Sequence, residues 1–371
     1  MEVANKKSVR LASLDAFRGF DMFWIMGMDE FLAAFAAVLG YPNFAEDFGH
    51  LPWEGLHFMD FVFPAFLFLA GASFPFSCAK SAERGLSRMA IAMRALRRGV
   101  VLALLGTVIY NRFLAEMDFA TFRIPSVLGY IGFGWTVAAW IYLWVKDVRA
   151  RIGIAAAILL AVTLVFGFVP APDAPAGAVR FSQEWHLGCW LDRTVLGAHC
   201  FAARFDPEGF GGLLCTVVSA MLGMFAGEIV RKGDSRPTER KALQLLLAGA
   251  VCAALGYALS FFYPIIKNVW SPSYALVTGG AAFAIFSLFY EIVDVKGWAR
   301  FPFFTVIGVN SITIYLAQKI VDFDGVSAFF LGGLANYLPD GWGRVLVLFG
   351  HVVACWLLLA FLNKKKIYLK V

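Results

Sequence analysis

Residues 61–78 read FVFPAFLFLAGASFPFSC, a continuous apolar stretch that contains no Lys, Arg, Asp or Glu. A helix that crosses about 30 Å of hydrocarbon needs roughly 20 mainly apolar residues, and the segment from Phe58 to Cys78 has that length. Its apolar residues run on without the alternation of a barrel strand, so the segment indicates a membrane helix.

The rest of the chain repeats this pattern. Its 371 residues are 60% hydrophobic and 16% charged, with a mean hydropathy of +0.71, and this composition excludes an ordinary water-soluble globular protein. We expect an all-α, polytopic membrane protein with about ten transmembrane helices and a single transmembrane domain, residues 1–371. The expected spans are Phe20–Leu39, Phe58–Cys78, Leu96–Leu114, Ile124–Val145, Ile152–Val169, Phe210–Val230, Ala242–Tyr263, Tyr274–Val293, Phe301–Ile320 and Val345–Leu362.

The distribution of basic residues predicts the orientation. Lys and Arg gather in the connections on the side of the amino end, and the other side has few of them. Examples on the basic side are Lys6, Lys7, Arg10, Lys80, Arg84, Lys146, Arg231 and Lys366. The positive-inside rule then predicts that both ends are cytoplasmic. The net charge of +6 is spread over these connections and forms no single patch, so we expect no nucleic-acid partner. A weaker stretch, Val326–Leu338, is expected to be re-entrant or interfacial.

Two external loops, about residues 40–57 and 170–209, stand out. The first contains no Lys or Arg, and the second is long enough to indicate a function or disorder. Cys189 and Cys200 share the second loop, where they either form a disulfide or remain thiols. The histidines lack the spacing of a zinc site, and we expect no metal.

Several ionisable residues fall at membrane depth, where a charge is costly and indicates a functional site by default. Asp15 and Arg18 share a helix face and either pair structurally or serve a site. Asp60 at the start of the second span either caps that helix or contributes to a site. His50 lies in the first external loop, where it either anchors the interface or exchanges a proton near neutral pH.

An ordered set of motifs resembles the heparan-α-glucosaminide N-acetyltransferase family and its bacterial relatives. The two longest are RLASLDAFRG at residues 10–19 and GHLPWEGLHFMDFVFPAFLFLAG at residues 49–71. The others are RIPSVL at 123–128, LDRTVLG at 191–197, FDPEG at 205–209, KNVWS at 267–271, VDVKG at 293–297, PFF at 302–304, GVNS at 308–311 and KKIY at 365–368. The motifs follow one another in order over nearly the whole chain.

The resemblance implies a transmembrane acetyltransferase that moves an acetyl group from cytosolic acetyl-CoA to an amino-sugar or glycan acceptor on the external side. The family's active-site histidine falls on His50, as base or acetyl carrier, and its companion asparagine falls on Asp29. At this position the sequence departs from the family, with an Asp in place of the Asn. The family's large luminal region is absent from this sequence, which favours a bacterial inner membrane. The resemblance also implies a possible homodimer.

The remaining expected site residues follow from these roles. The CoA phosphates need cations, for which Arg18, Arg94, Arg97 and Arg98 are candidates, although ordinary positive-inside residues would look the same. Asn310 and Ser311 are expected to bind the pantetheine arm or a neighbouring helix. Trp53, Asp60, Asp206 and Glu208 are the expected acceptor-binding residues. A multi-pass transporter of a small solute and a non-enzymatic scaffold remain alternatives.

Overall fold

The computed structural model describes residues 11–111, 118–202, 204–232, 237–298 and 301–369. Lys6, Lys7 and Arg10, on which the predicted orientation partly rests, lie outside the described residues, as does the end of the predicted span at Leu114. The described residues form helices and connections without a strand, apart from one isolated bridge between Glu54 and Ile266.

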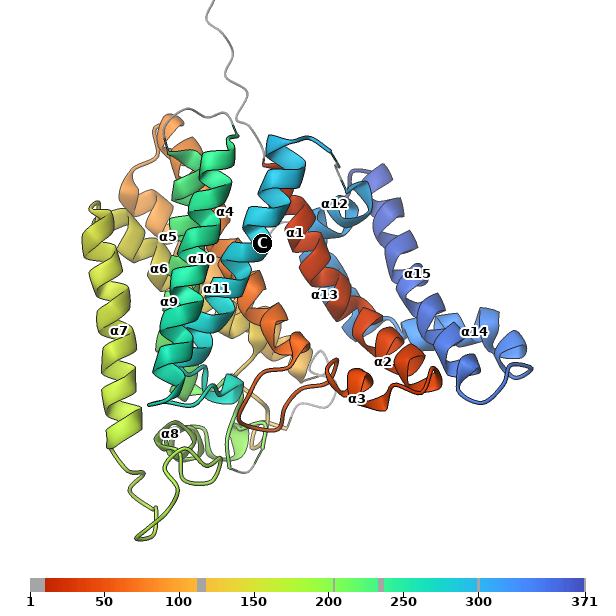
Figure 1. Ribbon diagram of the computed structural model, residues 1–371, viewed down its shortest axis with the longest axis horizontal. Coiled ribbons are helices and arrows are strands. Elements are labelled where there is room, and N and C mark those ends of the chain that lie inside the picture. Colours follow the sequence, from red (N-terminus) through yellow and green to blue (C-terminus); the bar gives the residue numbers. More distant parts are fainter. Residues whose placement is uncertain (1–10, 112–117, 203, 233–236, 299–300, 370–371) are drawn as a thin grey trace, which may run out of the picture.

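The chain begins with a long broken helix and ends with another long helix (Figure 1). The elements are α1 (Ala12–Phe23), η1 (Trp24–Met28), α2 (Asp29–Val38), α3 (Pro42–Glu46), η2 (Phe58–Phe61), α4 (Val62–Glu83), α5 (Arg88–Tyr110), α6 (Val127–Trp144), α7 (Val148–Phe168), α8 (Leu187–Val195), η4 (Gly197–His199), η5 (Phe210–Gly212), α9 (Leu213–Arg231), α10 (Glu239–Ser260), η6 (Lys267–Val269), α11 (Pro272–Phe289), η7 (Tyr290–Val295), α12 (Pro302–Val309), α13 (Ser311–Ile320), α14 (Phe323–Ala335) and α15 (Trp342–Lys364).

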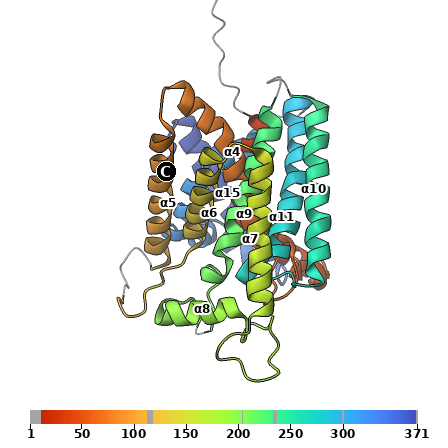
Figure 2. The same ribbon diagram turned by 90° about the vertical axis from the view of Figure 1, so that its left-hand side faces the viewer.

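These helices form one bundle with a larger and a smaller part. The larger part contains α4 to α7 and α9 to α11, and the smaller part places α1 against α12, with α14 and α15 beside them (Figure 1). α8 lies across one end of the bundle (Figure 2). We call this end, which is predicted to be external, the α8 end, and we call the opposite end the basic end.

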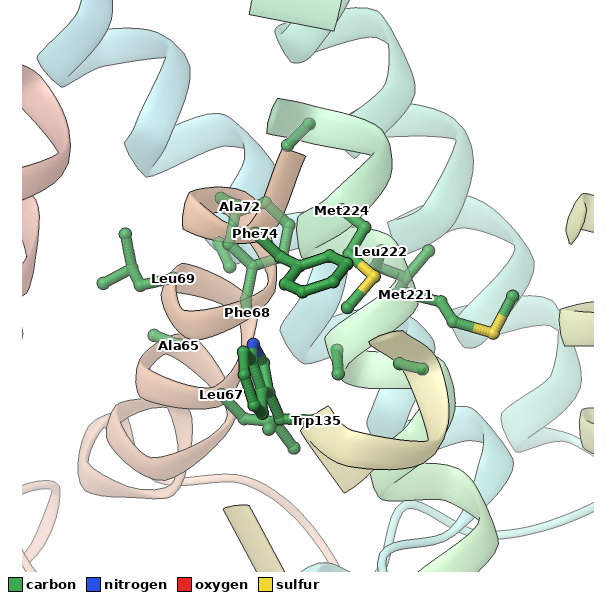
Figure 3. Packing of buried hydrophobic residues seen from close by; sticks show 14 of the residues in the cluster. Ala65, Leu67, Phe68, Leu69, Ala72, Phe74, Trp135, Met221, Leu222 and Met224 are labelled. Carbon is green, nitrogen blue, oxygen red and sulfur yellow. The ribbon is translucent and has the colours of Figure 1, made fainter. Parts of the chain in front are cut away.

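Small residues let the central helices approach closely. A Cβ atom added to Gly71 of α4 would lie 2.1 Å from the Ala220 carbonyl oxygen, and one added to Gly223 of α9 would lie 1.9 Å from that of Phe68. Figure 3 shows Phe68, Ala72 and Phe74 of α4 beside the segment of α9 that carries Leu222 and Met224. Since lipid tails are as apolar as these side chains, such close van der Waals packing is what holds membrane helices together.

The prediction of an all-α polytopic protein is confirmed, but the number of ten spans is not. Within the described residues, seven helices are long and apolar enough to cross a membrane, and the pair α12 and α13, bent by 70°, makes an eighth if it forms one span. The other two predicted spans are the charged α1–α2 segment and α5, which carries four arginines. The stretch predicted to be re-entrant forms the 13-residue helix α14, which is shorter than a full crossing.

The first helix is broken where the sequence predicted a continuous span. Gly27 has a φ of +96°, which favours glycine, and it lies in the π-helical segment η1 between α1 and α2. Gln318 Nε2 donates to the Ile25 carbonyl oxygen at 3.1 Å, so a polar group from α13 satisfies the backbone beside the break.

Candidate active site

The loop that carries His50 is fastened to the connection between α10 and α11. Its Gly55 N–H donates to the Ile265 carbonyl oxygen at 2.9 Å, next to the bridge between Glu54 and Ile266. Asn268 Nδ2 donates to the Pro52 carbonyl oxygen at 3.0 Å. These hydrogen bonds fix the position of the loop, which the sequence alone does not predict.

At the centre of this junction, an imidazole, a carboxylate and an ammonium group meet. His50 Nδ1 lies 2.8 Å from Asp60 Oδ1, and Lys267 Nζ lies 2.9 Å from each of these two atoms. The Asp60 side chain is 1% exposed, whereas that of His50 is 56% exposed. The cluster therefore has a buried carboxylate at its base and an accessible imidazole at its mouth.

The Asp60 carboxylate is fully engaged by the protein. Its second oxygen, Oδ2, accepts the His57 N–H at 2.9 Å, and Tyr274 OH donates to its backbone carbonyl oxygen at 2.7 Å. These contacts hold Asp60 beside His50 and Lys267, and its expected part in binding the acceptor stays a prediction. If His50 donates from Nδ1 to Asp60, the lone pair of Nε2 is free to accept a proton.

Lys267 is the residue of this cluster that sequence reasoning missed. It begins the short turn η6, which is followed by Trp270, a fully buried residue with the left-handed φ of 44°. Trp270 Nε1 donates to Ser219 Oγ at 3.0 Å, so the turn is anchored to α9. The sequence did place Lys267 in a motif and on the side that is poor in cations, but its partner Asp60 is 207 residues away along the chain.

Asp29 has no hydrogen bond to His50 among the described residues. It is half-buried in α2, close enough for its charge to interact with that of His50. The position next to the imidazole that was predicted for Asp29 is filled by Asp60.

Asp206 and Glu208, the other two acidic residues expected to bind the acceptor, form an ion cluster with Arg123. The Arg123 guanidinium donates to Asp206 at 2.7 and 3.2 Å and also bonds Glu208. Asp206 also accepts the backbone N–H groups of Phe201 and Glu208, at 2.7 and 2.9 Å. Burial lowers the pKa of Arg123, but its bonds to Asp206 and the negative charges of Glu208 and Asp206 together outweigh this and raise that pKa above its usual value. Asp206 therefore holds the long loop in shape, and its oxygens already have partners.

Burial also governs the titration of the loop around α8. It lowers the pKa of His186 to about 4 and raises the pKa of Asp192 to about 7. His186 Nδ1 accepts the Gly188 N–H at 3.0 Å, and Nε2 lies 2.6 Å from Tyr263 OH, which is the bonding of a neutral imidazole. Cys189 and Cys200, whose pairing the sequence left open, are free thiols.

Trp53 also holds the loops together at this end. Its Nε1 donates to the Phe181 carbonyl oxygen at 2.5 Å, and its half-buried ring lies edge-on to that of Phe205. Trp53 follows His50 by three residues in the sequence, and an aromatic ring at this place suits the stacking of a sugar.

Toward the basic end, arginines predicted to bind CoA line a cavity. Arg94, Arg97 and Arg98 of α5 line a cavity of about 450 Å³ together with Trp135 of α6. The Arg98 guanidinium lies 4.7 Å from the centre of the Trp135 ring, and its Nε is buried without a hydrogen-bond partner among the described residues. Arg18 donates to Ser73 Oγ at 2.9 Å, and its charge interacts with that of Arg98. An anion in this cavity would supply an acceptor that Arg98 lacks.

Asn310 lies at the break between α12 and α13, where the two helices bend by 70°. Its side chain is 1% exposed, and neither its amide nitrogen nor its oxygen has a partner in the described part of the chain. The neighbouring Ser311 is also buried. Leaving a buried amide unpaired costs free energy, so a ligand with a donor and an acceptor would fit here.

Comparison with known proteins finds two relatives that are named as acetyltransferases. Heparan-alpha-glucosaminide N-acetyltransferase of Mus musculus is 29% identical over 390 residues, which covers 87% of this chain and 56% of the relative. The protein of the same name from Homo sapiens is 28% identical over 421 residues, covering 98% of this chain and 60% of the relative. The chain thus spans little more than half the length of these relatives.

A shorter similarity covers less than half of the chain. NADH-ubiquinone oxidoreductase chain 6 of Cepphus columba is 27% identical over 157 residues, or 42% of this chain. No protein-family model matches the chain. The resemblance that the motifs indicated is confirmed over most of the chain, and it supports membership of the heparan-α-glucosaminide N-acetyltransferase family.

Proposed function

We propose that this protein is a transmembrane acetyltransferase, which takes acetyl groups from cytosolic acetyl-CoA and transfers them to an amino-sugar or glycan acceptor at the α8 end. The similarity to named N-acetyltransferases supports the reaction class. The observation that carries the proposal is the exposed His50 imidazole held by the buried Asp60 carboxylate beside Lys267.

The donor enters from the basic end. The phosphates of CoA would bind among Arg94, Arg97 and Arg98, with Arg18 nearby, because arginine pairs with phosphate through two hydrogen bonds at once. The pantetheine arm, which carries amide donors and acceptors, would meet Asn310 and Ser311 at the helix break. This path would bring the thioester from the basic end toward His50.

His50 then acts as the general base. An acceptor that arrives as an ammonium ion first gives one proton to water and becomes an amine. Nε2 of His50 then takes a proton from this amine, or from a hydroxyl, as the lone pair of the acceptor forms a bond to the acetyl carbonyl carbon. The carbon–sulfur bond breaks, and the leaving thiolate takes the proton from the imidazolium. The Asp60 carboxylate stabilises the imidazolium that forms between these steps, and Lys267 stabilises that carboxylate.

An acetyl-histidine relay uses the same residues in two steps. His50 would first attack the thioester, release CoA and hold the acetyl group until the acceptor arrives, which gives ping-pong kinetics. Release of one CoA per protein before any acceptor is added would identify the relay.

The acceptor approaches a surface of negative charge. The first loop and the start of α2 carry Asp29, Glu30, Glu46, Asp47 and Glu54 without a Lys or Arg in the loop. These carboxylates attract an amino sugar in its ammonium form, and Trp53 offers a ring on which a sugar can stack. The proposal retains the expected bacterial inner membrane, whose cytoplasm supplies acetyl-CoA, and the expected homodimer.

Proteoliposomes with the two substrates in separate compartments test this function. Acetyl-CoA is added outside, glucosamine and other amino sugars are enclosed inside, and both compartments are analysed by mass spectrometry. We expect acetylated sugar inside and an equal amount of CoA outside. Passage of unmodified sugar with no more CoA release than from protein-free liposomes would show a transporter instead.

Paired arginine variants test the donor site in the same assay. Arg97→Gln with Arg98→Gln should raise the KM for acetyl-CoA by at least about tenfold, since hydrogen bonds between charged groups contribute roughly 1.5 to 3 kcal/mol. Arg88→Gln, an exposed change on the same helix, should leave that KM unaltered.

A further inference from the structure

A groove larger than the arginine cavity lies on the outside of the bundle, away from both that cavity and the His50 cluster. It has a volume of about 1250 Å³ and lies between α7, α9, α10 and α11. α7 packs against α9 and α11, and the most apolar windows of α7 and α10 are only 22% buried (Figure 2). We call this groove the α7–α10 groove.

The walls of the α7–α10 groove are apolar for most of its length. They include Leu159, Leu222, Phe225, Val251, Leu255 and Phe262. Lining residues on α10 extend from Leu247 to Leu259, which is about 18 Å at 1.5 Å per residue. One leaflet contributes about half of the roughly 30 Å of hydrocarbon, so the groove is long enough for an acyl chain.

One end of the groove is cationic. Arg151, Arg231 and Lys232 line it together with a single carboxylate, Glu228. These residues lie at the start of α7 and the end of α9, and both positions belong to the basic end. Three positive charges thus face one negative charge at the depth where lipid headgroups are expected.

Arg151 has unused hydrogen-bond donors at this end. Its side chain is 6% exposed, and one of its nitrogens, Nη2, bonds Glu228 Oε1 at 2.8 Å. Nε and Nη1 have no acceptor among the described residues, although the guanidinium lies 4.6 Å from the centre of the Tyr142 ring. Buried guanidinium donors without acceptors are costly, and a phosphate at the end of the groove would supply the missing oxygens.

We propose that the α7–α10 groove binds an anionic glycerophospholipid of the leaflet at the basic end. One acyl chain lies along the apolar wall, and the phosphate interacts with Arg151, Arg231 and Lys232. Charge complementarity selects an anionic headgroup over a zwitterionic one, since the three cations exceed the one carboxylate. The site is separate from the proposed acetyl-CoA path and does not depend on the proposed function.

Native mass spectrometry of the full-length protein with added lipids tests this proposal. Dioleoyl phosphatidylglycerol and dioleoyl phosphatidylcholine are supplied in equal amounts, and the lipid retained by the protein is identified. We expect preferential retention of phosphatidylglycerol. Arg231→Gln with Lys232→Gln, which changes two exposed positions, should reduce that preference by about tenfold, as expected for lost charged hydrogen bonds to the phosphate.

Two further variants control for charge and for volume. Arg149→Gln removes one positive charge from an exposed residue outside the groove and should retain the preference. Ala156→Trp places a large ring in the groove from an exposed position of α7 and should reduce the retention of both lipids.

Three results would overturn the proposal. The first is equal retention of the two lipids by the wild-type protein, and the second is an unchanged preference in the Arg231→Gln, Lys232→Gln variant. The third is conversion of a dimer to a monomer by Ala156→Trp, measured by light scattering, which would assign the groove to a second copy of the chain.

Discussion

At His50, one ring nitrogen meets both a carboxylate and an ammonium group. Lys267 balances the charge of the buried Asp60, so the carboxylate can remain ionised with little exposure to water. An ionised Asp60 stabilises a protonated imidazole, which is the species that general-base catalysis must form. The same arrangement leaves Nε2 as the nitrogen that can face a substrate.

Asp60→Asn should therefore impair catalysis much more than Asp29→Asn. The first change removes the charge that stabilises the His50 imidazolium, and we expect kcat to fall by roughly 10²-fold or more, the scale of general acid–base effects. Asp29 has no hydrogen bond to His50 in the described residues, so its variant should retain most of the activity. Steady-state rates of CoA release, with acetyl-CoA binding as the folding control, compare the two. A larger loss of kcat in Asp29→Asn than in Asp60→Asn would show that Asp29 is the partner of His50, as the resemblance implies.

The sequence predicted His50 but not its partners. A histidine beside Trp53 in a loop without cations indicated either an interfacial anchor or a catalytic base, and the family resemblance favoured the base. The contacts from Lys267 and Asp60 depend on the pairing of the first loop with residues 265–266. Such a long-range pairing leaves no periodic signal in the sequence. The family resemblance therefore offered only Asp29 as the partner of His50.

At the scale of single elements, α1 and α12 touch through two glycines. A Cβ atom at Gly19 would lie 1.7 Å from the Phe304 carbonyl oxygen, and one at Gly308 would lie 1.9 Å from that of Asp15. Both are backbone atoms, which cannot move aside without moving a helix. This contact places Asn310 two residues from the closest approach of the helices.

Gly308→Ala should destabilise the protein by forcing these helices apart. Overpacking of this kind costs about 1 to 3 kcal/mol, and we expect a lower Tm together with weaker acetyl-CoA binding. Gly153→Ala in α7 is the matched control, since nothing lies within 4 Å of its added Cβ. Thermal unfolding of the two variants in the same detergent measures the difference, and equal Tm values would contradict the observed packing.

His186, which caps α8, should make the protein less stable in acid. Burial lowers its pKa to about 4, below the usual value of about 6.5, so the unfolded chain binds the proton more readily between these two values. Its contribution to stability is complete above pH 6.5 and decreases by up to about 3 kcal/mol as the pH falls to 4.

The variant His186→Asn removes this titration and retains a side chain that can cap the helix. The Tm of the wild-type protein should therefore fall more steeply between pH 7 and pH 4.5 than that of His186→Asn. Parallel slopes in thermal unfolding would show that His186 is not held in its neutral form.

The helices themselves were largely predictable, because long apolar runs such as that of α4 have few other structures available in a membrane. Their interruptions were harder to predict. Gly27 breaks the first helix through its positive φ, and the turn at Asn310 divides the ninth span, although both lie within apolar runs. Hydropathy averages over a whole span and does not register a single backbone angle.

At the scale of the whole molecule, two polar sites lie toward opposite ends of one bundle. The arginine cavity lies toward the basic end and the His50 cluster lies at the α8 end, while α1 and the broken pair α12–α13 run between them (Figure 1). The proposed function needs the basic end to face the cytoplasm, which the distribution of Lys and Arg predicts.

Accessible cysteines test this orientation. In a variant with Cys200→Ser, Glu46→Cys should react with a membrane-impermeant maleimide in intact spheroplasts of an expressing bacterium. Lys146→Cys should react only after lysis. Both positions are exposed, so burial cannot account for a missing reaction. The reverse pattern would show that the protein has the opposite orientation, with the arginine cavity toward the outside of the cell.

The rate of acetyl transfer by His50→Ala tests the central claim most directly. With acetyl-CoA and an accepted amino sugar, we predict a kcat about 10² to 10⁴ times lower than that of the wild-type protein, with unchanged acetyl-CoA binding. His199→Ala, a histidine at the same end of the bundle, should remain close to the wild-type rate. A folded His50→Ala protein that transfers acetyl groups at the wild-type rate would contradict the account.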